Sequence, residues 1–295
     1  MKRVLVTGAT GFVGNAVIGS LSDKGYVPVA LMRRGSEKKL GHKADVVYGD
    51  VLDKSSLLKA MTDVYAVIHL VGIIREFPRK GVTFDKMHVQ ATENVVSSMN
   101  EAGIKRYVHM SANGTRQGAV SRYHITKYKA EEAVRTSGLT YTIFRPSLIF
   151  GPQDTFINML AGFMKSTPVF TYFGDGSYPM MPVYVKDVAD CFVNAIDNTE
   201  SFHGTFPLCG ENLVSYKELL KMISRTLGRK HLLMPVPEIF IKAGIAMFGK
   251  TEWFPITSDQ FTMLTEGNTC DDSSAFTMLG VNRHRLEETV ASYLK

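Results

Sequence analysis

The chain has 295 residues, of which 45% are hydrophobic and 21% charged, and its formal net charge is +6. This length allows one large domain or two coupled ones with an ample core. Three scattered cysteines without CxxC spacing argue against a disulfide framework or a structural zinc site, and they favour a reducing compartment.

Targeting and membrane signals are absent from the sequence pattern. Glycines interrupt the apolar start before a signal peptide can form, and no apolar run approaches the roughly 18 residues of a spanning helix. We therefore expect a soluble, cytoplasmic protein, or one held peripherally at the inner face of a membrane.

The first half of the chain alternates short β-branched runs with longer helical patterns. The expected strands are 3–7, 27–32, 44–48, 64–71, 106–111 and 140–149. The expected helices are 12–23, 53–61, 83–101 and 122–136, with Asp53 as an N-cap and Gly25, Gly103 and Gly138 as left-handed C-terminal residues. This alternation predicts an α/β fold of the Rossmann type, with a doubly wound parallel sheet.

Beyond residue 150 the pattern becomes irregular. Short extended pieces mix with Pro and Gly, and helical patterns return at 187–197, 215–227, 237–248 and 285–294. We expect residues 1–150 to form the dinucleotide-binding domain, with 182–198 returning to it. Residues 151–295 would mainly form a smaller, loop-rich region for substrate or partner.

The stretch VTGATGFVG places three glycines between the first strand and the first helix. Gly8 suits a tight turn, Gly11 lets the backbone approach a pyrophosphate, and Gly14 lets helix and strand pack closely. The free N–H groups at the helix start favour phosphate. We expect this loop, with Thr10, Phe12 and Val13, to bind a dinucleotide.

A basic segment follows the second strand and carries most of the net charge. Residues 33–43 hold five basic side chains against Glu37, which gives +4 of the total +6. A dinucleotide fold that selects NAD usually places Asp or Glu at this strand end, whereas Arg33 and Arg34 suit a 2′-phosphate. The sequence therefore favours NADP(H), with NAD(H) as the alternative, and it argues against a diffuse nucleic-acid-binding surface.

Two further strand ends can line the adenosine half of the cofactor, since ligands of such sheets lie outside the carboxyl ends of the strands. They are Asp50-Val51 after the third strand and Leu70-Val71-Gly72 after the fourth.

A Tyr/Lys pair opens the helix after the fifth strand. Tyr123 and Lys127 are four residues apart and so share one helical face. A lysine ammonium beside a phenol favours the phenolate and lowers its pKa, which prepares the tyrosine for proton exchange with a carbonyl or alcohol. Alone, this spacing is typical of a solvated helix face; behind a glycine loop it indicates catalysis.

These motifs, together with GDV at 49–51, HLVG at 69–72, RPSLIFGPQD at 145–154 and PVYVKDVAD at 182–190, resemble the short-chain dehydrogenase/reductase superfamily in its extended and atypical branches. HLVGIIRE and FRPSLIFGPQDTFINML look most like the subgroup of the Rossmann-fold accessory subunit of respiratory complex I and its bacterial relatives. The resemblance implies that Tyr123 is the acid/base, that Lys127 holds the nicotinamide ribose and tunes the tyrosine, and that Arg145-Pro146-Ser147 lie near the nicotinamide. Ser111 is a further candidate for the cofactor site, and Ser111 or Asn113 is the candidate to replace the hydroxyl of the active members.

One position departs from the active members of that superfamily. They carry a Ser or Thr hydroxyl after the fifth strand, where this chain has Ala112 and Asn113. Three readings follow: an NADP(H)-dependent oxidoreductase acting on a fairly apolar small molecule, a non-catalytic cofactor-binding subunit or assembly factor of a respiratory complex, and an NAD-dependent sugar-nucleotide epimerase or dehydratase. Arg33 and Arg34 argue against the third.

Four histidines and one apolar helical stretch are the remaining residues considered for a function. We expect His69, His88 and His109 to be packed, hydrogen-bonded residues rather than metal ligands, and His124 to be exposed beside Tyr123. The stretch 237–254 is expected to form an amphipathic helix with Trp253 near its end and to be buried in the core, with contact to a membrane surface as the alternative.

Overall fold

The structure, a computed structural model, describes residues 1–249, 251, 254 and 256–294, so Trp253 lies outside the described residues. The chain divides into two compact units. The first comprises Met1–Pro146, Val185–Leu208 and Asp272–Asn282, and the second comprises Ser147–Tyr184, Cys209–Asp271 and Arg283–Lys295.

The first unit is built on a seven-stranded parallel sheet in the order β11-β6-β5-β4-β1-β2-β3. Its strands are β1 (Arg3–Thr7), β2 (Val27–Met32), β3 (Asp45–Tyr48), β4 (Ala66–His69), β5 (Arg106–Met110), β6 (Thr140–Pro146) and β11 (Gly204–Leu208). The strand order reverses between β1 and β4, which is where such sheets bind their ligands. The expected doubly wound parallel sheet is therefore confirmed.

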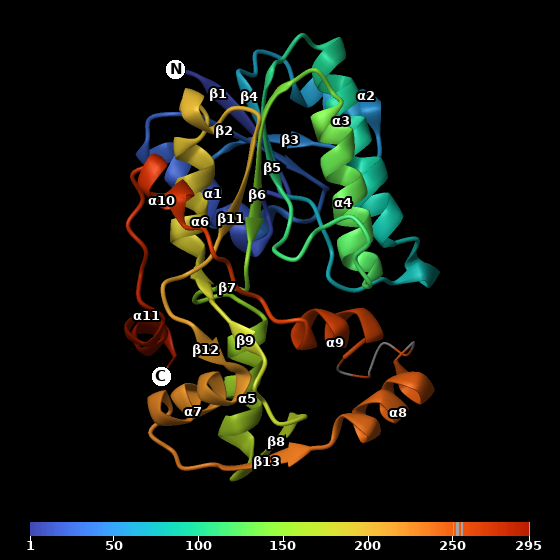
Figure 1. Ribbon diagram of the computed structural model, residues 1–295. Coiled ribbons are helices and arrows are strands. Elements are labelled where there is room, and N and C mark those ends of the chain that lie inside the picture. Colours follow the sequence, from blue (N-terminus) through green and yellow to red (C-terminus); the bar gives the residue numbers. More distant parts are fainter. Residues whose placement is uncertain (250, 252–253, 255, 295) are drawn as a thin grey trace. The chain divides into compact units, whose positions relative to one another are not determined.

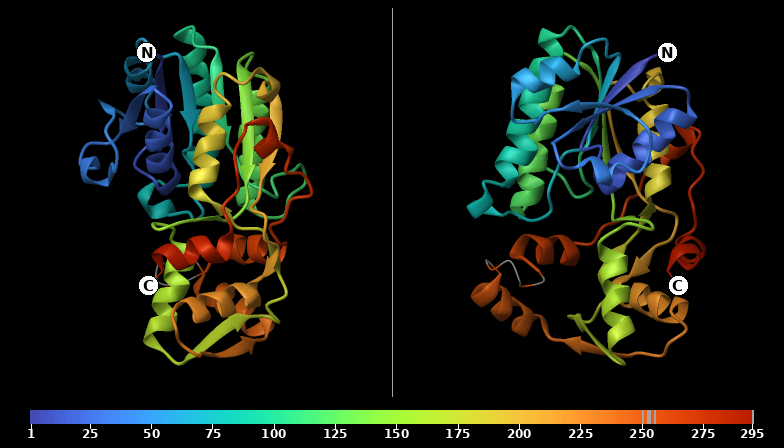
Figure 2. Two further views of the ribbon diagram at one scale, coloured as in Figure 1. Left: turned by 90° about the vertical axis from the view of Figure 1, so that its left-hand side faces the viewer. Right: turned by 180° about the vertical axis from the view of Figure 1, so that it is seen from behind.

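Helices cover both faces of this sheet, as Figures 1 and 2 show. One face carries α1 (Phe12–Asp23) and α6 (Val185–Asn194), and the other carries α2 (Lys54–Ala60), α3 (Ala91–Glu101) and α4 (Arg122–Arg135). The short helix α10 (Ser274–Met278) also belongs to this unit. Between the sheet and the α2–α4 layer, buried side chains such as Leu5, Val67 and Tyr107 form one apolar core.

Local signals for helix ends are confirmed. The Asp53 side chain accepts a hydrogen bond from the Ser55 amide and caps α2. Gly25, Gly103 and Gly138 have φ of 78°, 73° and 74°, the left-handed conformation in which a side chain is strained.

Three boundaries differ from expectation. The strand expected at 64–71 is only Ala66–His69, and the one expected at 140–149 ends at Pro146. The first turns of the helix expected at 83–101 are a π-helix, Asp85–Gln90. The sequence did not predict β11, because Gly and Pro in GTFPL weaken the strand pattern; an edge position tolerates that proline.

The second unit contains three two-stranded ladders and five helices among the residues described. The ladders pair β7 (Ile149–Phe150) with β10 (Val183–Tyr184), β9 (Pro179–Met180) with β12 (Val214–Ser215), and β8 (Val169–Phe173) with β13 (Leu232–Val236). The helices are α5 (Phe156–Ser166), α7 (Tyr216–Thr226), α8 (Glu238–Phe248), α9 (Ser258–Thr265) and α11 (Leu286–Tyr293). Their core includes Phe150, Met164 and Leu219.

A disulfide in this unit corrects the expectation of reduced, unpaired cysteines. Cys209 and Cys270 are bonded, with their Cα atoms 5.9 Å apart, and Cys191 is free and buried. The bonded pair is 61 residues apart in sequence. The local spacing of the cysteines does not predict this bond, because only the tertiary fold brings the two residues together.

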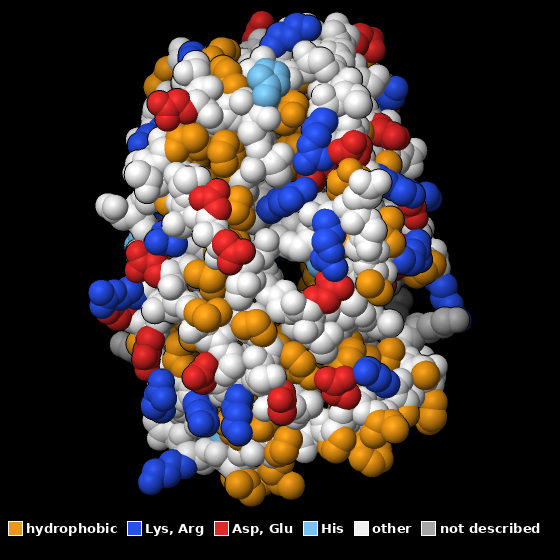
Figure 3. Space-filling view, in the orientation of Figure 1, with side chains coloured by type: hydrophobic (Ala, Val, Ile, Leu, Met, Phe, Trp, Pro, Cys, Tyr) orange, Lys and Arg blue, Asp and Glu red, His pale blue; other side chains and the backbone are white. Residues whose placement is uncertain are grey.

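The second unit also exposes apolar side chains. Figure 3 shows hydrophobic side chains gathered over β8, β13 and α8. In the part of the chain that the structure describes, none of the helices has the length and apolar character needed to cross a bilayer.

Candidate functional site

The glycine loop takes the conformation that its spacing predicts. Gly8 has φ of 76°, and its carbonyl accepts a hydrogen bond of 3.0 Å from the Gly11 amide, which closes the turn. A Cβ on Gly14 would overlap the Gly8 carbonyl oxygen and would lie 2.7 Å from the Ala9 Cα. Gly14 therefore lets α1 start directly against β1.

The loop ends at the N-terminus of α1. Gly11 is the N-cap and provides no side-chain cap for the helix. Phe12 and Val13 form the first turn, and Thr10 precedes it half-buried. Uncapped amides of this kind are suited to bind an anionic phosphate.

Arg33 and Arg34 lie at the carboxyl end of β2. Both are exposed, and the Arg34 guanidinium stacks over the Tyr48 ring, 4.7 Å from its centroid. Tyr48 ends the neighbouring strand β3, so the stacking holds one guanidinium at the sheet edge. This edge is suited to a phosphate on the adenosine ribose.

Hydrogen bonds to backbone groups hold the loops after β3 and β4 in place. The Asp50 carboxylate accepts from the Leu52 amide at 2.9 Å, and the carbonyl of the buried Val51 accepts from the Asn94 side chain at 3.1 Å. After β4, the amide of buried Leu70 donates to the Thr7 carbonyl at 3.1 Å.

The loop after β4 meets both other parts of the site. A Cβ on Gly8 would lie 3.3 Å from the Val71 nitrogen, and one on Gly72 would lie 3.0 Å from the Lys127 Nζ. The structure thus brings together the glycine loop, residues 70–72 and the Tyr/Lys helix at one edge of the sheet.

Tyr123 and Lys127 are both buried on α4, which excludes a solvated helix face. They are 8% and 2% exposed. The Tyr123 ring makes edge contacts with Phe84 and His88, at centroid distances of 5.9 and 5.3 Å. The Lys127 Nζ donates to the Met110 carbonyl at the end of β5, at 2.9 Å.

The expected effect of Lys127 on the phenol is wrong. Burial raises the pKa of Tyr123 to about 12. Burial also lowers the pKa of Lys127 to about 8, opposed by the charge of Glu131. At neutral pH the Tyr123 phenol therefore keeps its proton.

Ser111 is hydrogen-bonded into a buried ion-pair network around Glu131. Its hydroxyl donates to Glu131 Oε1 at 2.5 Å, and the Glu131 side chain has no exposed surface. Arg145 donates to the two Glu131 carboxylate oxygens through Nε and Nη2, at 2.8 and 2.6 Å, and Arg135 adds a bond at 2.7 Å. The Ser111 hydroxyl is thus hydrogen-bonded to a carboxylate. Ala112, the next residue, is buried, and so is Pro146 at the end of β6.

Glu131 is the residue that the sequence analysis missed. It lies four positions after Lys127 and one further turn along the same face of α4. That spacing was the available signal. Besides Arg135 on the same helix, however, the partners of the carboxylate come from β6 and from the end of β5, which only the fold identifies.

The histidines expected to be packed are buried and hydrogen-bonded. His69 Nδ1 lies 2.6 Å from the Thr7 hydroxyl, and His88 Nδ1 lies 2.8 Å from the Thr126 hydroxyl. His109 Nδ1 lies 3.1 Å from the Tyr107 hydroxyl. Within the described residues there is no cluster of three or more His, Cys, Asp or Glu that could hold a metal ion.

His124 corrects another expectation. It is 4% exposed rather than exposed beside Tyr123. Its ring packs against Gly114, where a Cβ would lie 2.9 Å from the ring. Because Gly114 belongs to the loop before α4 and not to the helix itself, the helix pattern alone does not reveal this burial.

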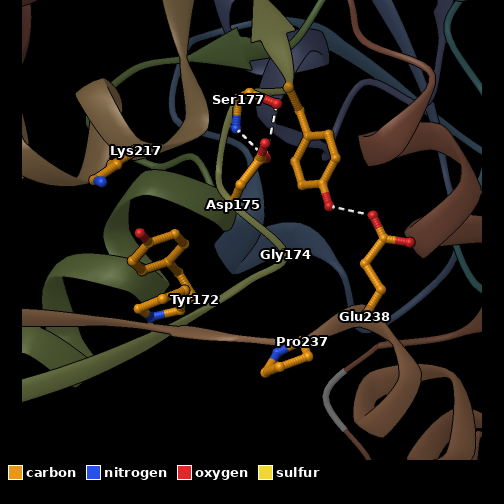
Figure 4. A pocket seen from close by; sticks show the side chains of 9 residues that line it. Tyr172, Gly174, Asp175, Ser177, Lys217, Pro237 and Glu238 are labelled. Atoms are coloured by element: carbon orange, nitrogen blue, oxygen red, sulfur yellow. Dashed lines mark hydrogen bonds between the residues drawn. The ribbon is translucent and has the colours of Figure 1, made fainter.

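A pocket of about 620 Å³ lies in the second unit. Tyr172, Asp175, Tyr178, Lys217 and Glu238 are among its lining residues, several of which Figure 4 labels. The Tyr178 hydroxyl donates to Glu238 at 2.7 Å. None of the expected cofactor or catalytic residues lines it.

Comparison with known proteins gives a family and a fold. The model of the NAD dependent epimerase/dehydratase family matches residues 4–206. A mitochondrial protein of Arabidopsis thaliana, NADH dehydrogenase (ubiquinone) 1 alpha subcomplex subunit 9, is 30% identical over 310 residues, covering 98% of this chain and 76% of the relative. A ceramide reductase of Caulobacter vibrioides is 28% identical over 188 residues, covering 63% of this chain and 58% of the relative.

Among solved structures, UDP-glucose 4-epimerase of Thermotoga maritima, crystallised with UDP-glucose, has the same fold. The two match with a TM-score of 0.78 at 21% identity, over 99% of this chain and 98% of the epimerase. The chain therefore belongs to the NAD-dependent epimerase/dehydratase family, within the extended and atypical short-chain dehydrogenases/reductases, whose members bind NAD(P).

Proposed function

We propose that the chain is an NADP(H)-binding oxidoreductase that acts on a carbonyl or hydroxyl carbon of a small, fairly apolar molecule. The observation that carries the proposal is the buried Tyr123 and Lys127 pair beside Gly72, at the sheet edge that also holds the glycine loop. The reductase activity named for the relative from Caulobacter vibrioides supports this class of chemistry.

The residues divide the work between binding and proton transfer. When bound, the reduced nicotinamide supplies a hydride, that is, two electrons and one proton, to the carbonyl carbon. Tyr123 donates its phenolic proton to the carbonyl oxygen, which gives the alcohol, and solvent returns the proton. Lys127 uses one N–H on the Met110 carbonyl, which leaves two donors for ribose hydroxyls.

Tyr123→Phe tests the chemistry. The variant should bind NADPH like the wild type and lose roughly 100-fold or more of its turnover, because general acid catalysis contributes at least that much. The measurement is NADPH oxidation with a panel of carbonyl compounds and quinones, together with NADPH titration. Tyr128→Phe, on the same helix, is the matched control and should keep its activity. Wild-type protein that binds NADPH and reduces nothing would contradict the proposal.

Arg33 and Arg34 test the cofactor. Changing both to Ala should weaken NADPH binding by about 10- to 100-fold, since charge-assisted hydrogen bonds contribute roughly 1.5–3 kcal/mol, and should leave NADH binding unchanged. Calorimetric titration measures both affinities. Arg225→Ala, an exposed arginine of the second unit, is the control. Tighter binding of NADH than of NADPH by the wild type would overturn the preference.

A second function is favoured by one observation. The Ser111 hydroxyl donates to Glu131 and Ala112 has no hydroxyl, so neither residue offers a hydroxyl proton to a substrate carbonyl. The relative from Arabidopsis thaliana is named as an NADH dehydrogenase subunit. We therefore keep, as the alternative, a non-catalytic NADP(H)-binding subunit or assembly factor of a respiratory complex. It predicts that Tyr123→Phe leaves the cellular role intact.

A further inference from the structure

Helix α8 presents apolar side chains to solvent along most of its length. No residue of this helix, EIFIKAGIAMF, is buried. Ile239, Phe240 and Met247 are 71%, 66% and 69% exposed. A helix of a globular protein normally buries its apolar stripe, so a stripe left in water requires a partner.

The charges of α8 neutralise each other. Lys242 Nζ lies 2.8 Å from Glu238 Oε2, an i,i+4 pair, and Glu238 also accepts from the Tyr178 hydroxyl at 2.7 Å. The helix has no net charge, and its one ion pair is internal. The cost of moving it into an apolar phase is therefore limited to this one pair.

The outer face of the β8–β13 ladder continues the same apolar surface. Leu232 is paired with Val169, and Met234 follows on the same face because side chains alternate along a strand. These three are 62%, 41% and 47% exposed, whereas Phe170 and Tyr172 on the opposite face belong to the core. β13 leads directly into α8, and Figure 3 shows the hydrophobic side chains of both over one region of the unit.

Basic side chains border this surface where β8 and β13 begin. Lys165, Arg229 and Lys230 are exposed, and the Arg229 guanidinium donates to the Lys165 carbonyl. Residues 229–248 contain three Lys or Arg and one acidic residue, Glu238, which is already paired. The border of the apolar surface is therefore positively charged at the end where β8 and β13 begin.

We propose that this surface, formed by Val169, Leu232, Met234, Ile239, Phe240 and Met247, docks on a lipid bilayer that carries anionic headgroups. Apolar side chains enter the boundary between headgroups and acyl chains, while Lys165, Arg229 and Lys230 lie at headgroup level. An α8 of 11 residues is about 16 Å long, so it lies in the interface and does not cross the bilayer.

Charge favours the bilayer over a second copy of the chain. A two-fold dimer through this surface would bring two copies of the same basic border into one interface, which is unfavourable. An anionic bilayer is complementary to both the apolar centre and the basic border. The proposal stands independently of the oxidoreductase activity.

The experiment is flotation of the full chain with vesicles. One set is made of phosphatidylcholine alone and the other contains 30% phosphatidylglycerol, a composition chosen for the test. We expect binding to the anionic vesicles that falls by about tenfold or more in the triple variant Ile239→Ser, Phe240→Ser, Met247→Ser. Val120→Ser, an exposed apolar residue (72%) of the first unit, is the control and should bind normally.

A second variant separates charge from apolar insertion. Lys165→Gln, Arg229→Gln and Lys230→Gln together should remove the preference for anionic over neutral vesicles. Circular dichroism and NADPH titration verify that each variant is folded. Failure to bind either vesicle, or equal binding by the triple serine variant, overturns the proposal. Concentration-dependent dimerisation that the serine variant abolishes, without vesicle binding, would assign the surface to a second copy.

Discussion

The absence of a side chain at Gly14 sets the geometry of the cofactor loop. Its α-carbon lies so close to β1 that any side chain would meet the backbone of Gly8 and Ala9. The loop can therefore place the start of α1 beside the end of β1, where its amides are available to a phosphate.

Gly14→Ala should destabilise the protein by about 2 kcal/mol or more, because the methyl group meets rigid backbone rather than a movable side chain. Gly162→Ala is the matched control: it also lies in a helix, with nothing within 4 Å of an added Cβ, and should be neutral or stabilising by up to about 1 kcal/mol. Urea denaturation of both variants measures the difference. Equal stability of the two variants would contradict this account of the loop.

At the scale of elements, α4 connects the expected catalytic pair to a buried charge network. Tyr123, Lys127 and Glu131 follow at intervals of four. Tyr123 contacts the His88 ring of the π-helix, Lys127 bonds the Met110 carbonyl of β5, and Glu131 binds Arg145 of β6. Glu131 fixes the Ser111 hydroxyl at the end of β5 and the Arg145 guanidinium on β6. The helix is thereby held against the carboxyl ends of two strands.

Glu131→Ala should cost about 3–5 kcal/mol of unfolding free energy, because it leaves the Arg145 guanidinium without its buried partner. Glu132→Ala removes the neighbouring carboxylate, whose side chain is 47% exposed and pairs with Arg135 at the surface; it should cost less than about 1 kcal/mol. Thermal and urea denaturation compare the two. A small effect of the Glu131 variant would show that the network is not what holds α4 in place.

At the scale of the whole molecule, buried histidines couple stability to pH. Burial lowers the pKa of His69 to about 3, that of His88 to about 2 and that of His109 well below its ordinary value. These groups are neutral in the folded chain, whereas in the unfolded chain they gain protons below about pH 6.5. The unfolded state binds more protons there, so stability is fully present above pH 6.5 and is lost as the pH falls.

The three histidines should together remove roughly 4 kcal/mol of stability per pH unit between about pH 5.5 and 4, at about 1.4 kcal/mol for each proton. Urea denaturation at several pH values gives the slope. His69→Asn should reduce it by about a third whatever its effect at pH 7, and His42→Asn, on an exposed residue, should leave it unchanged. A slope insensitive to His69→Asn would show that this histidine does not titrate on unfolding.

The sequence by itself determined six of the seven strands of the Rossmann sheet and the helices between them, because these segments carry their own period, cap or turn glycine; the edge strand β11 does not. Helix α1 spans the expected 12–23, and Asp53 caps α2 as expected. The positions of Gly8, Gly14 and the Tyr123/Lys127 pair follow from this order, since parallel strands place their carboxyl ends at one edge.

Only the tertiary structure decided which groups surround those residues. The Cys209–Cys270 bond, the burial of His124, the carboxylate that binds Ser111 and the raised pKa of Tyr123 all depend on contacts with residues of other segments. The exposure of α8 is of the same kind: its apolar pattern fits a core helix equally well, and only the packing of its neighbours leaves it in water. Periodicity specifies an element and its apolar face, but burial and desolvation are properties of the contacts that the whole fold creates.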